Sequence, residues 1–164
     1  FGIGTFHGDL HPGNCIIDED GKFVFIDNGA ICHAPQHVNR SLFTFFEHLS
    51  KKELPQAFDA LLKMSTANLE SVKLEKYYST MEEIYHDFEK KPVGEQSLTQ
   101  IMMKTVRTAV EKAKADFGEE AFPIIRALMY LDGLVIRTHP DVMLIQSMGP
   151  YLEEFRIGLD IGDN

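Results

Sequence analysis

The stretch that decides the fold is His7-Gly8-Asp9-Leu10-His11-Pro12-Gly13-Asn14, followed further along the chain by Ile26-Asp27-Asn28-Gly29. Between them lie Cys15-Ile16-Ile17 and residues 22–26, two short runs rich in β-branched and aromatic residues, which favour strands. The segment that separates the runs, Asp18-Glu19-Asp20-Gly21, is typical of a turn. The sequence therefore predicts a β-hairpin that returns the chain, so that Asp27 faces Asn14.

The residue types in this pattern match one kind of chemistry. Residues 7–14 fit the kinase catalytic-loop signature H-x-D-L-x-x-x-N, and Asp27 stands in the place of the D-F-G aspartate. Phosphoryl transfer depends on positioning and charge neutralisation rather than on covalent help from the protein. Asp9 would orient the attacking hydroxyl or water and accept its proton. Asn14 and Asp27 would bind the Mg²⁺ ions that bridge the phosphates of ATP, because Mg²⁺ prefers oxygen ligands.

Other readings of these residues explain less. Turn preference accounts for the Pro-Gly pair but not for a second polar site after a hairpin. Residues 8–11 also resemble the first metal-binding motif of metallophosphoesterases, but the later G-D-x-x-D and G-N-H-D/E motifs are absent from the sequence. The pairs His7/His11 and His33/His37 have a spacing that suits zinc on a helix. However, the first pair lies in a Pro-Gly loop and the second has no carboxylate nearby.

Composition limits the class of protein. The 164 residues carry a formal net charge of −9, with 44% hydrophobic and 25% charged residues. An acidic chain is a poor ligand for nucleic acid, which requires a basic face. Two cysteines without a CxxC motif predict reduced thiols and a reducing, cytoplasmic-side compartment. No apolar run approaches the roughly 20 residues that a membrane-spanning helix needs.

From Pro35 onward the pattern of apolar residues is helical. Pro35 suits the first turn of a helix, whose predicted buried side is made of Val38, Leu42, Phe45, Phe46 and Leu49. A capping-box pattern, Ser50-Lys51-Lys52-Glu53, predicts the start of a second helix that runs through Lys63.

Three more helices and some shorter helical pieces are predicted after these. The third covers residues 69–90, the fourth runs from a cap at Ser97 to Phe117 and stops at Gly118, and the fifth opens at Pro123 and ends before Pro140. Arg126, Asp132 and Arg137 interrupt the apolar fifth helix, and a buried ion pair or hydrogen-bonded network explains them better than catalysis does.

Together these elements predict a mainly α fold, a protein-kinase-like C-lobe in which a short β-hairpin carries the catalytic and metal loops and five or more helices follow. Residues 1–164 form one lobe, with the loops and the hairpin in residues 1–33 and a helical subdomain in residues 34–164. Because the chain opens directly on the motif at Phe1, we expect a piece of a larger protein whose N-lobe is absent from this chain.

The motifs HGDLHPGN and IDNG resemble those of both the aminoglycoside-phosphotransferase-like kinases and the UbiB/AarF-type atypical kinases. Residues 122–133 (FPIIRALMYLDG), followed by THPD at residues 138–141 and by Pro150-Tyr151, are similar to the late region of UbiB-type proteins. The resemblance covers most of the chain and favours the UbiB type.

This resemblance implies ATP with Mg²⁺ and a role in isoprenoid-quinone or lipid metabolism, as an ATPase or a kinase of small molecules. It also implies that Asp9 is the catalytic-loop aspartate and that Asn14 and Asp27 are the metal ligands. His11 lies where Ser/Thr kinases have a lysine near the transferred phosphate, and its charge near neutral pH would help there. A lipid substrate would bring the parent protein to a membrane surface.

Departures from the protein-kinase pattern leave two alternatives open. Gly8 replaces the arginine that couples the catalytic loop to a phosphorylated activation loop, and the short span before Pro35 leaves no platform for a protein substrate. A small-molecule phosphotransferase of the aminoglycoside or choline type therefore also fits. Asn28 replaces a phenylalanine that packs into the core, where a polar group is costly. A pseudokinase that binds without catalysis is the second alternative.

Overall fold

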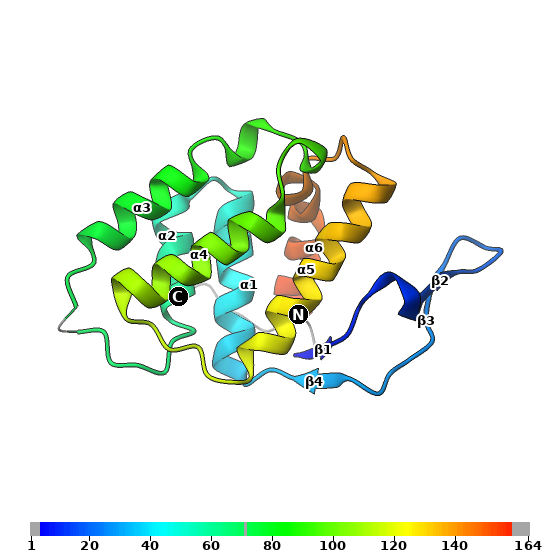
Figure 1. Ribbon diagram of the computed structural model, residues 1–164, viewed down its shortest axis with the longest axis horizontal. Helices are drawn as coiled ribbons and strands as arrows, with labels where there is room; N and C mark the ends of the chain where they lie inside the picture. Colours follow the sequence, from blue (N-terminus) through cyan, green and yellow to red (C-terminus); the bar gives the residue numbers. More distant parts are fainter. Residues whose placement is uncertain (1–3, 71, 159–164) are drawn as a thin grey trace.

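Six α-helices form the body of the described chain, and the N-terminal strands lie at one edge of it, as the computed structural model in Figure 1 shows for residues 4–70 and 72–158. The α-helices are α1 (Gln36–Ser50), α2 (Leu54–Leu62), α3 (Glu75–Tyr85), α4 (Leu98–Ala113), α5 (Ala121–Thr138) and α6 (Leu144–Gly158). The short 3-10 helices are η1 (Pro12–Asn14), η2 (Phe88–Lys90) and η3 (Val93–Glu95). The strands are β1 (Thr5–His7), β2 (Cys15–Ile17), β3 (Phe23–Phe25) and β4 (Ile31–His33).

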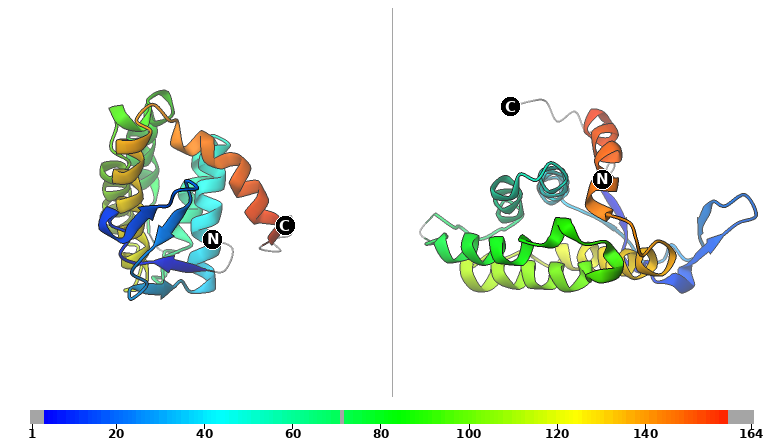
Figure 2. Two further views of the ribbon diagram at one scale, coloured as in Figure 1. Left: turned by 90° about the vertical axis from the view of Figure 1, so that its right-hand side faces the viewer. Right: turned by 90° about the horizontal axis from the view of Figure 1, so that it is seen from above.

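The helices pack around one apolar core. Helix α1 contacts α2 and α6, α3 contacts α2 and α4, and α4 contacts α5; Figure 2 shows α1 and α2 on one side of α3 and α4. Large side chains at the centre are fully buried, among them Phe43, Phe58, Tyr77 and Met81. The Tyr77 hydroxyl donates to the Phe58 carbonyl at 2.9 Å, so the buried phenol has a partner.

The structure contains a helix in each region where the sequence predicts one, and the prediction for α1 is the most accurate. Its five predicted core residues are all buried, and Pro35 immediately precedes its first residue. Helix α4 begins after Ser97, whose hydroxyl accepts from Gln100 N at 3.1 Å, so the predicted cap is present. Helix α5 ends at Thr138, before Pro140, as expected.

Several predicted boundaries are wrong. Ser50 is the last residue of α1, where its hydroxyl donates to the Glu47 carbonyl at 2.7 Å, so it does not cap α2. Helix α3 is shorter than residues 69–90. Helix α4 stops at Ala113 because Lys114 takes a left-handed conformation with φ of 59°. The predicted short pieces at the end are one 15-residue helix, α6, with Pro150 inside it.

The strands form two small antiparallel sheets, one nested within the other. The inner pair, β2 with β3, is the predicted hairpin, with Ile16 opposite Val24. The outer pair, β1 with β4, was not predicted, and it places Phe6 opposite Cys32. The chain therefore runs in along β1, through the inner hairpin, and out along β4.

Candidate functional site

The nested hairpins bring the two motif loops together. One loop connects β1 to β2 and contains Asp9, and the other connects β3 to β4 and contains Asp27. Gly8 N donates to Ala30 O at 2.7 Å at the outer end of the loops, and Ile26 N donates to Asn14 O at 3.1 Å at the inner end. Backbone hydrogen bonds thus hold the two motif loops together at both ends.

Asn14 is fixed by its side-chain amide nitrogen. Its side chain is buried, and Nδ2 donates to the Asp9 carbonyl at 3.0 Å. Because an amide nitrogen only donates, the atom that remains for a ligand is Oδ1. The 3-10 turn η1 sets this geometry, since Asn14 N donates to His11 O at 2.9 Å. His11 itself accepts from Gly13 N at Nδ1, at 3.0 Å, which gives it a role in shaping the loop.

His7 joins the two loops, a role that sequence reasoning missed. Its Nδ1 accepts from Asp9 N at 3.3 Å, and its Nε2 is hydrogen-bonded to the Asp27 carbonyl. Both contacts fit the tautomer that carries its proton on Nε2. The first letter of the H-x-D signature was the available signal, because it places a ring with two polar atoms next to both loops.

Asp27 is exposed and partly engaged. Its Oδ1 accepts from Gly29 N at 2.9 Å, an Asx turn that orients the carboxylate and leaves Oδ2 for a ligand. Asn28 is also exposed, so in the described chain its polar side chain carries none of the burial cost expected from the sequence. Strand β4 and α1 follow at once, which agrees with the short span expected after this motif.

Asn14 and Asp27 fit a hard divalent cation. Both offer oxygen atoms, the ligand type of Mg²⁺, which is commonly held by one or two protein groups together with phosphates and water. Among the described residues no group of three or more His, Cys, Asp or Glu could hold a metal ion. Both ring nitrogens of His7 already have hydrogen-bond partners, which argues against the zinc interpretation.

Of the polar residues on α5, Asp132 agrees with the sequence-based prediction, and Arg126 and Arg137 do not. Asp132 is buried and accepts from Thr99 N at 2.8 Å and Thr99 Oγ1 at 2.7 Å, which confirms a hydrogen-bonded network. Arg126 and Arg137 are exposed, so the prediction of a buried ion pair is wrong for them. Instead, Arg126 Nε donates to the Gly8 carbonyl at 2.7 Å, across 118 positions of sequence.

Comparison with known proteins agrees with this geometry. The model of the ABC1 atypical kinase-like domain matches residues 1–59, which contain both motif loops and α1. A probable protein kinase UbiB of Pseudomonas putida is 23% identical over 158 residues, which cover 92% of this chain and 28% of that protein. The chain is thus similar to the ABC1 atypical kinase-like domain over its first 59 residues and to UbiB proteins over most of its length.

Other relatives extend the likeness across bacteria and plants. The probable protein kinase UbiB of Blochmanniella pennsylvanica is 24% identical over 162 residues, covering 92% of this chain and 28% of that protein. The chloroplastic protein Activity of BC1 complex kinase 3 of Arabidopsis thaliana is 24% identical over 158 residues, covering 90% and 20%. The chain thus spans only 20–28% of the length of these relatives. No solved structure matches.

The kinase-like C-lobe expected from the sequence is confirmed, as a mainly helical chain with a short hairpin. Cys15 and Cys32 are free thiols. The helices within the described ranges include none with the length and apolar character that crossing a membrane requires.

Proposed function

We propose that this chain is the catalytic lobe of an ATP- and Mg²⁺-dependent atypical kinase or ATPase that acts on a small molecule or lipid, in isoprenoid-quinone or lipid metabolism. One observation carries the proposal. The backbone bonds Gly8–Ala30 and Ile26–Asn14 hold the Asp9 loop against the Asp27 loop. Similarity to the ABC1 atypical kinase-like domain supports a nucleotide-dependent reaction, and the resemblance to UbiB-type proteins supports the metabolic setting.

Each residue has a defined part in this proposal. Mg²⁺, when bound, neutralises the negative charge of the ATP phosphates. Asn14 Oδ1 and Asp27 Oδ2 are the atoms that would hold it. Asp9 orients the hydroxyl of the acceptor, or a water molecule, and takes its proton. His11 lies in the same loop, from which its imidazole would approach the transferred phosphate.

The direct test is Asp27→Asn in the full-length protein. The variant should lose ATP hydrolysis by a factor of about 100 or more, because a neutral amide binds Mg²⁺ far more weakly than a carboxylate does. Hydrolysis is measured by phosphate release with and without Mg²⁺. The matched control is Asp20→Asn, which changes an exposed aspartate in the hairpin turn whose carboxylate lies 3.5 Å from Lys22 Nζ.

Asp20→Asn should turn over ATP like the wild type. Equal hydrolysis by wild type and Asp27→Asn would overturn the proposal. Binding of ATP by the wild type with no turnover would favour the pseudokinase alternative instead.

A second candidate is phosphoryl transfer to a small hydroxylated acceptor, as in aminoglycoside- or choline-type phosphotransferases. The short connection from Gly29 through β4 to α1 favours it, because this connection holds no long segment on which a protein substrate could bind. Turnover of ATP that rises sharply when a hydroxylated acceptor is added would support this candidate. A constant rate across a panel of acceptors would favour the ATPase.

A further inference from the structure

One face of α5 lies against the catalytic loop. Pro123, Arg126 and Tyr130 are spaced three and four residues apart, so they project from the same side of the helix. Arg126 Nε donates to Gly8 O at 2.7 Å, and the Tyr130 ring meets the His11 ring edge-on, with centroids 6.2 Å apart. Contacts between α5 and β1 continue this interface toward the N-terminus.

The geometry around Gly8 explains why the loop depends on a residue from α5. A Cβ atom at position 8 would lie 2.7 Å from Ala30 O, which already accepts the hydrogen bond of Gly8 N. A side chain at this position would therefore clash with backbone. The same Cβ position is 3.7 Å from Arg126 Nη2. The guanidinium of Arg126 thus stands beside the position at which protein kinases carry their own arginine.

The peptide unit between Gly8 and Asp9 is held at both polar ends. Its carbonyl oxygen accepts from Arg126 Nε at 2.7 Å, and its N–H donates to His7 Nδ1 at 3.3 Å. The opposite nitrogen of His7 is hydrogen-bonded to the Asp27 carbonyl. A continuous chain of hydrogen bonds therefore runs from Arg126, through the backbone of Asp9, to Asp27. Hydrogen bonds in such a chain polarise and strengthen one another.

We propose that Arg126 is a positioning residue that supplies, from α5, the cation that the catalytic loop lacks at Gly8, and so fixes Asp9 relative to Asp27. The inference rests on the proposed function and adds a residue to it. Residue 126 lies outside the part that the family model matches. Helix α5 is itself secured, because buried Asp132 binds the first turn of α4 through Thr99.

Exposure of Arg126 makes this role separable from folding. Its side chain is exposed, so its replacement opens no cavity in the core. The bond it makes joins a charged donor to a carbonyl, the stronger type of hydrogen bond. Loss of that bond should loosen the Gly8–Asp9 peptide without unfolding the helical body.

The test compares Arg126→Met, Arg126→Lys and Arg137→Met in the full-length protein. Arg126→Met should lower kcat for Mg-ATP hydrolysis by roughly tenfold, the effect of one charge-assisted hydrogen bond, while KM for ATP stays within about twofold. Arg126→Lys should restore only part of kcat, because an ammonium does not reproduce the planar Nε–H donor. Arg137→Met removes an exposed arginine from the same helix and should behave like the wild type.

Hydrogen–deuterium exchange of peptides that cover residues 5–14 provides a readout without turnover. Exchange should accelerate in Arg126→Met and remain unchanged in Arg137→Met. If the wild type does not hydrolyse ATP, the proposed function fails, and the exchange data still decide whether Arg126 orders the loop. If the wild type is active and Arg126→Met leaves either kcat or loop exchange unchanged, the positioning role is overturned.

Discussion

At the scale of single residues, the site depends on main-chain hydrogen bonds and on the space between the two loops as much as on acidic side chains. Asp9, Asn14 and Asp27 are set by bonds that involve main-chain atoms of Gly8, Asn14 and Gly29. Gly8 has the strictest requirement, because Ala30 O lies 2.7 Å from where its Cβ would be. The departure from the protein-kinase arginine is thus a steric consequence of how closely the two loops approach.

Gly8→Ala tests this requirement. The added methyl group must push β1 and β4 apart, and overpacking of this kind costs about 1–3 kcal/mol. We expect faster hydrogen exchange in β1 and β4 and lower ATP turnover in the full-length protein. Gly133→Ala is the control: a Cβ there has nothing within 4 Å, and alanine in a helix interior stabilises by about 0.5–1 kcal/mol. Unchanged exchange in Gly8→Ala would contradict the steric account.

The sequence predicted how the two motif loops meet better than it predicted the contacts that hold them. Asp9, Asn14 and Asp27 lie in contiguous motifs, and one predicted hairpin was enough to bring their loops together; the roles of the three residues stay predictions. The bond from Arg126 to Gly8 O spans 118 positions and goes to a carbonyl, which every residue carries. No local pattern marks such an acceptor, which is why the sequence alone predicts a buried ion pair or network for Arg126.

At the scale of elements, prediction succeeded where periodicity was long and failed where it was short. Helix α1 shows its apolar face over 15 residues, whereas β1 and β4 have only three residues each. Three residues are too few to display a period of two, so the outer hairpin gave no signal. The Ser50 pattern misled because α1 extends as far as Ser50, and the hydroxyl of Ser50 serves the end of one helix instead of the start of the next.

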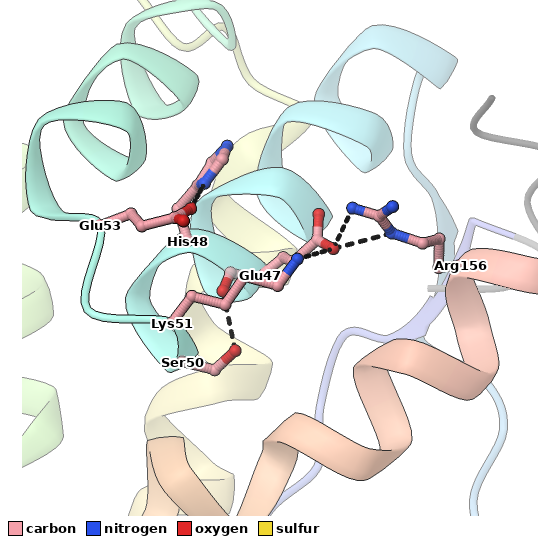
Figure 3. A network of polar contacts seen from close by, with 6 residues as sticks. All are labelled: Glu47, His48, Ser50, Lys51, Glu53 and Arg156. Carbon is pink, nitrogen blue, oxygen red and sulfur yellow. Dashed lines mark hydrogen bonds and ion pairs between the residues drawn. The ribbon is translucent and has the colours of Figure 1, made fainter. Parts of the chain in front are cut away.

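Helix α6 is joined to α1 by a buried carboxylate. Figure 3 shows Arg156 of α6 directed at Glu47 of α1, beside Lys51. Glu47 Oε1 accepts from Arg156 Nε at 2.8 Å and from Lys51 Nζ at 2.9 Å. Burial raises the pKa of Glu47, but the hydrogen bonds from Lys51 and Arg156 outweigh it, so the pKa lies below the ordinary 4.5. The network therefore stabilises the docking of α6 only while Glu47 is ionised.

Glu47→Gln should weaken this docking by about 1–3 kcal/mol near neutral pH, because Arg156 loses its charged acceptor. A lowered pKa gives stability that is complete above the unfolded-state value and is lost as pH falls through the folded-state value. The difference between wild type and variant should therefore shrink below about pH 4.5. Hydrogen exchange of α6 across pH, corrected for intrinsic rates, measures it. Glu111→Gln, in an exposed pair with Arg107, is the control, and a pH-independent difference would contradict the argument.

At the scale of the whole molecule, the described chain consists of two parts of unequal size, a helical body and a small hairpin. The helical body encloses its own core, whereas the β2–β3 hairpin projects away from it (Figure 1). Apolar side chains on and beside this hairpin are between 41% and 57% exposed: Ile16, Ile17, Phe23, Val24, Phe25, Ile26 and Ile31. Exposed apolar side chains gathered on one small element mark an interaction site, and a two-stranded hairpin is marginally stable on its own.

The N-lobe expected in the parent protein is predicted to cover this hairpin, and a comparison of two proteins tests that. In the isolated 164-residue chain, peptides from residues 15–26 should exchange quickly, because three-residue strands with open faces give little protection. In the full-length protein they should exchange far more slowly. Ile16→Glu should remove that protection, since it would bury an unpaired charge in the contact, whereas Glu19→Gln in the turn should preserve it. Equal exchange in the two proteins would show that the apolar face remains open, and the site loops would then need another source of order to hold ATP.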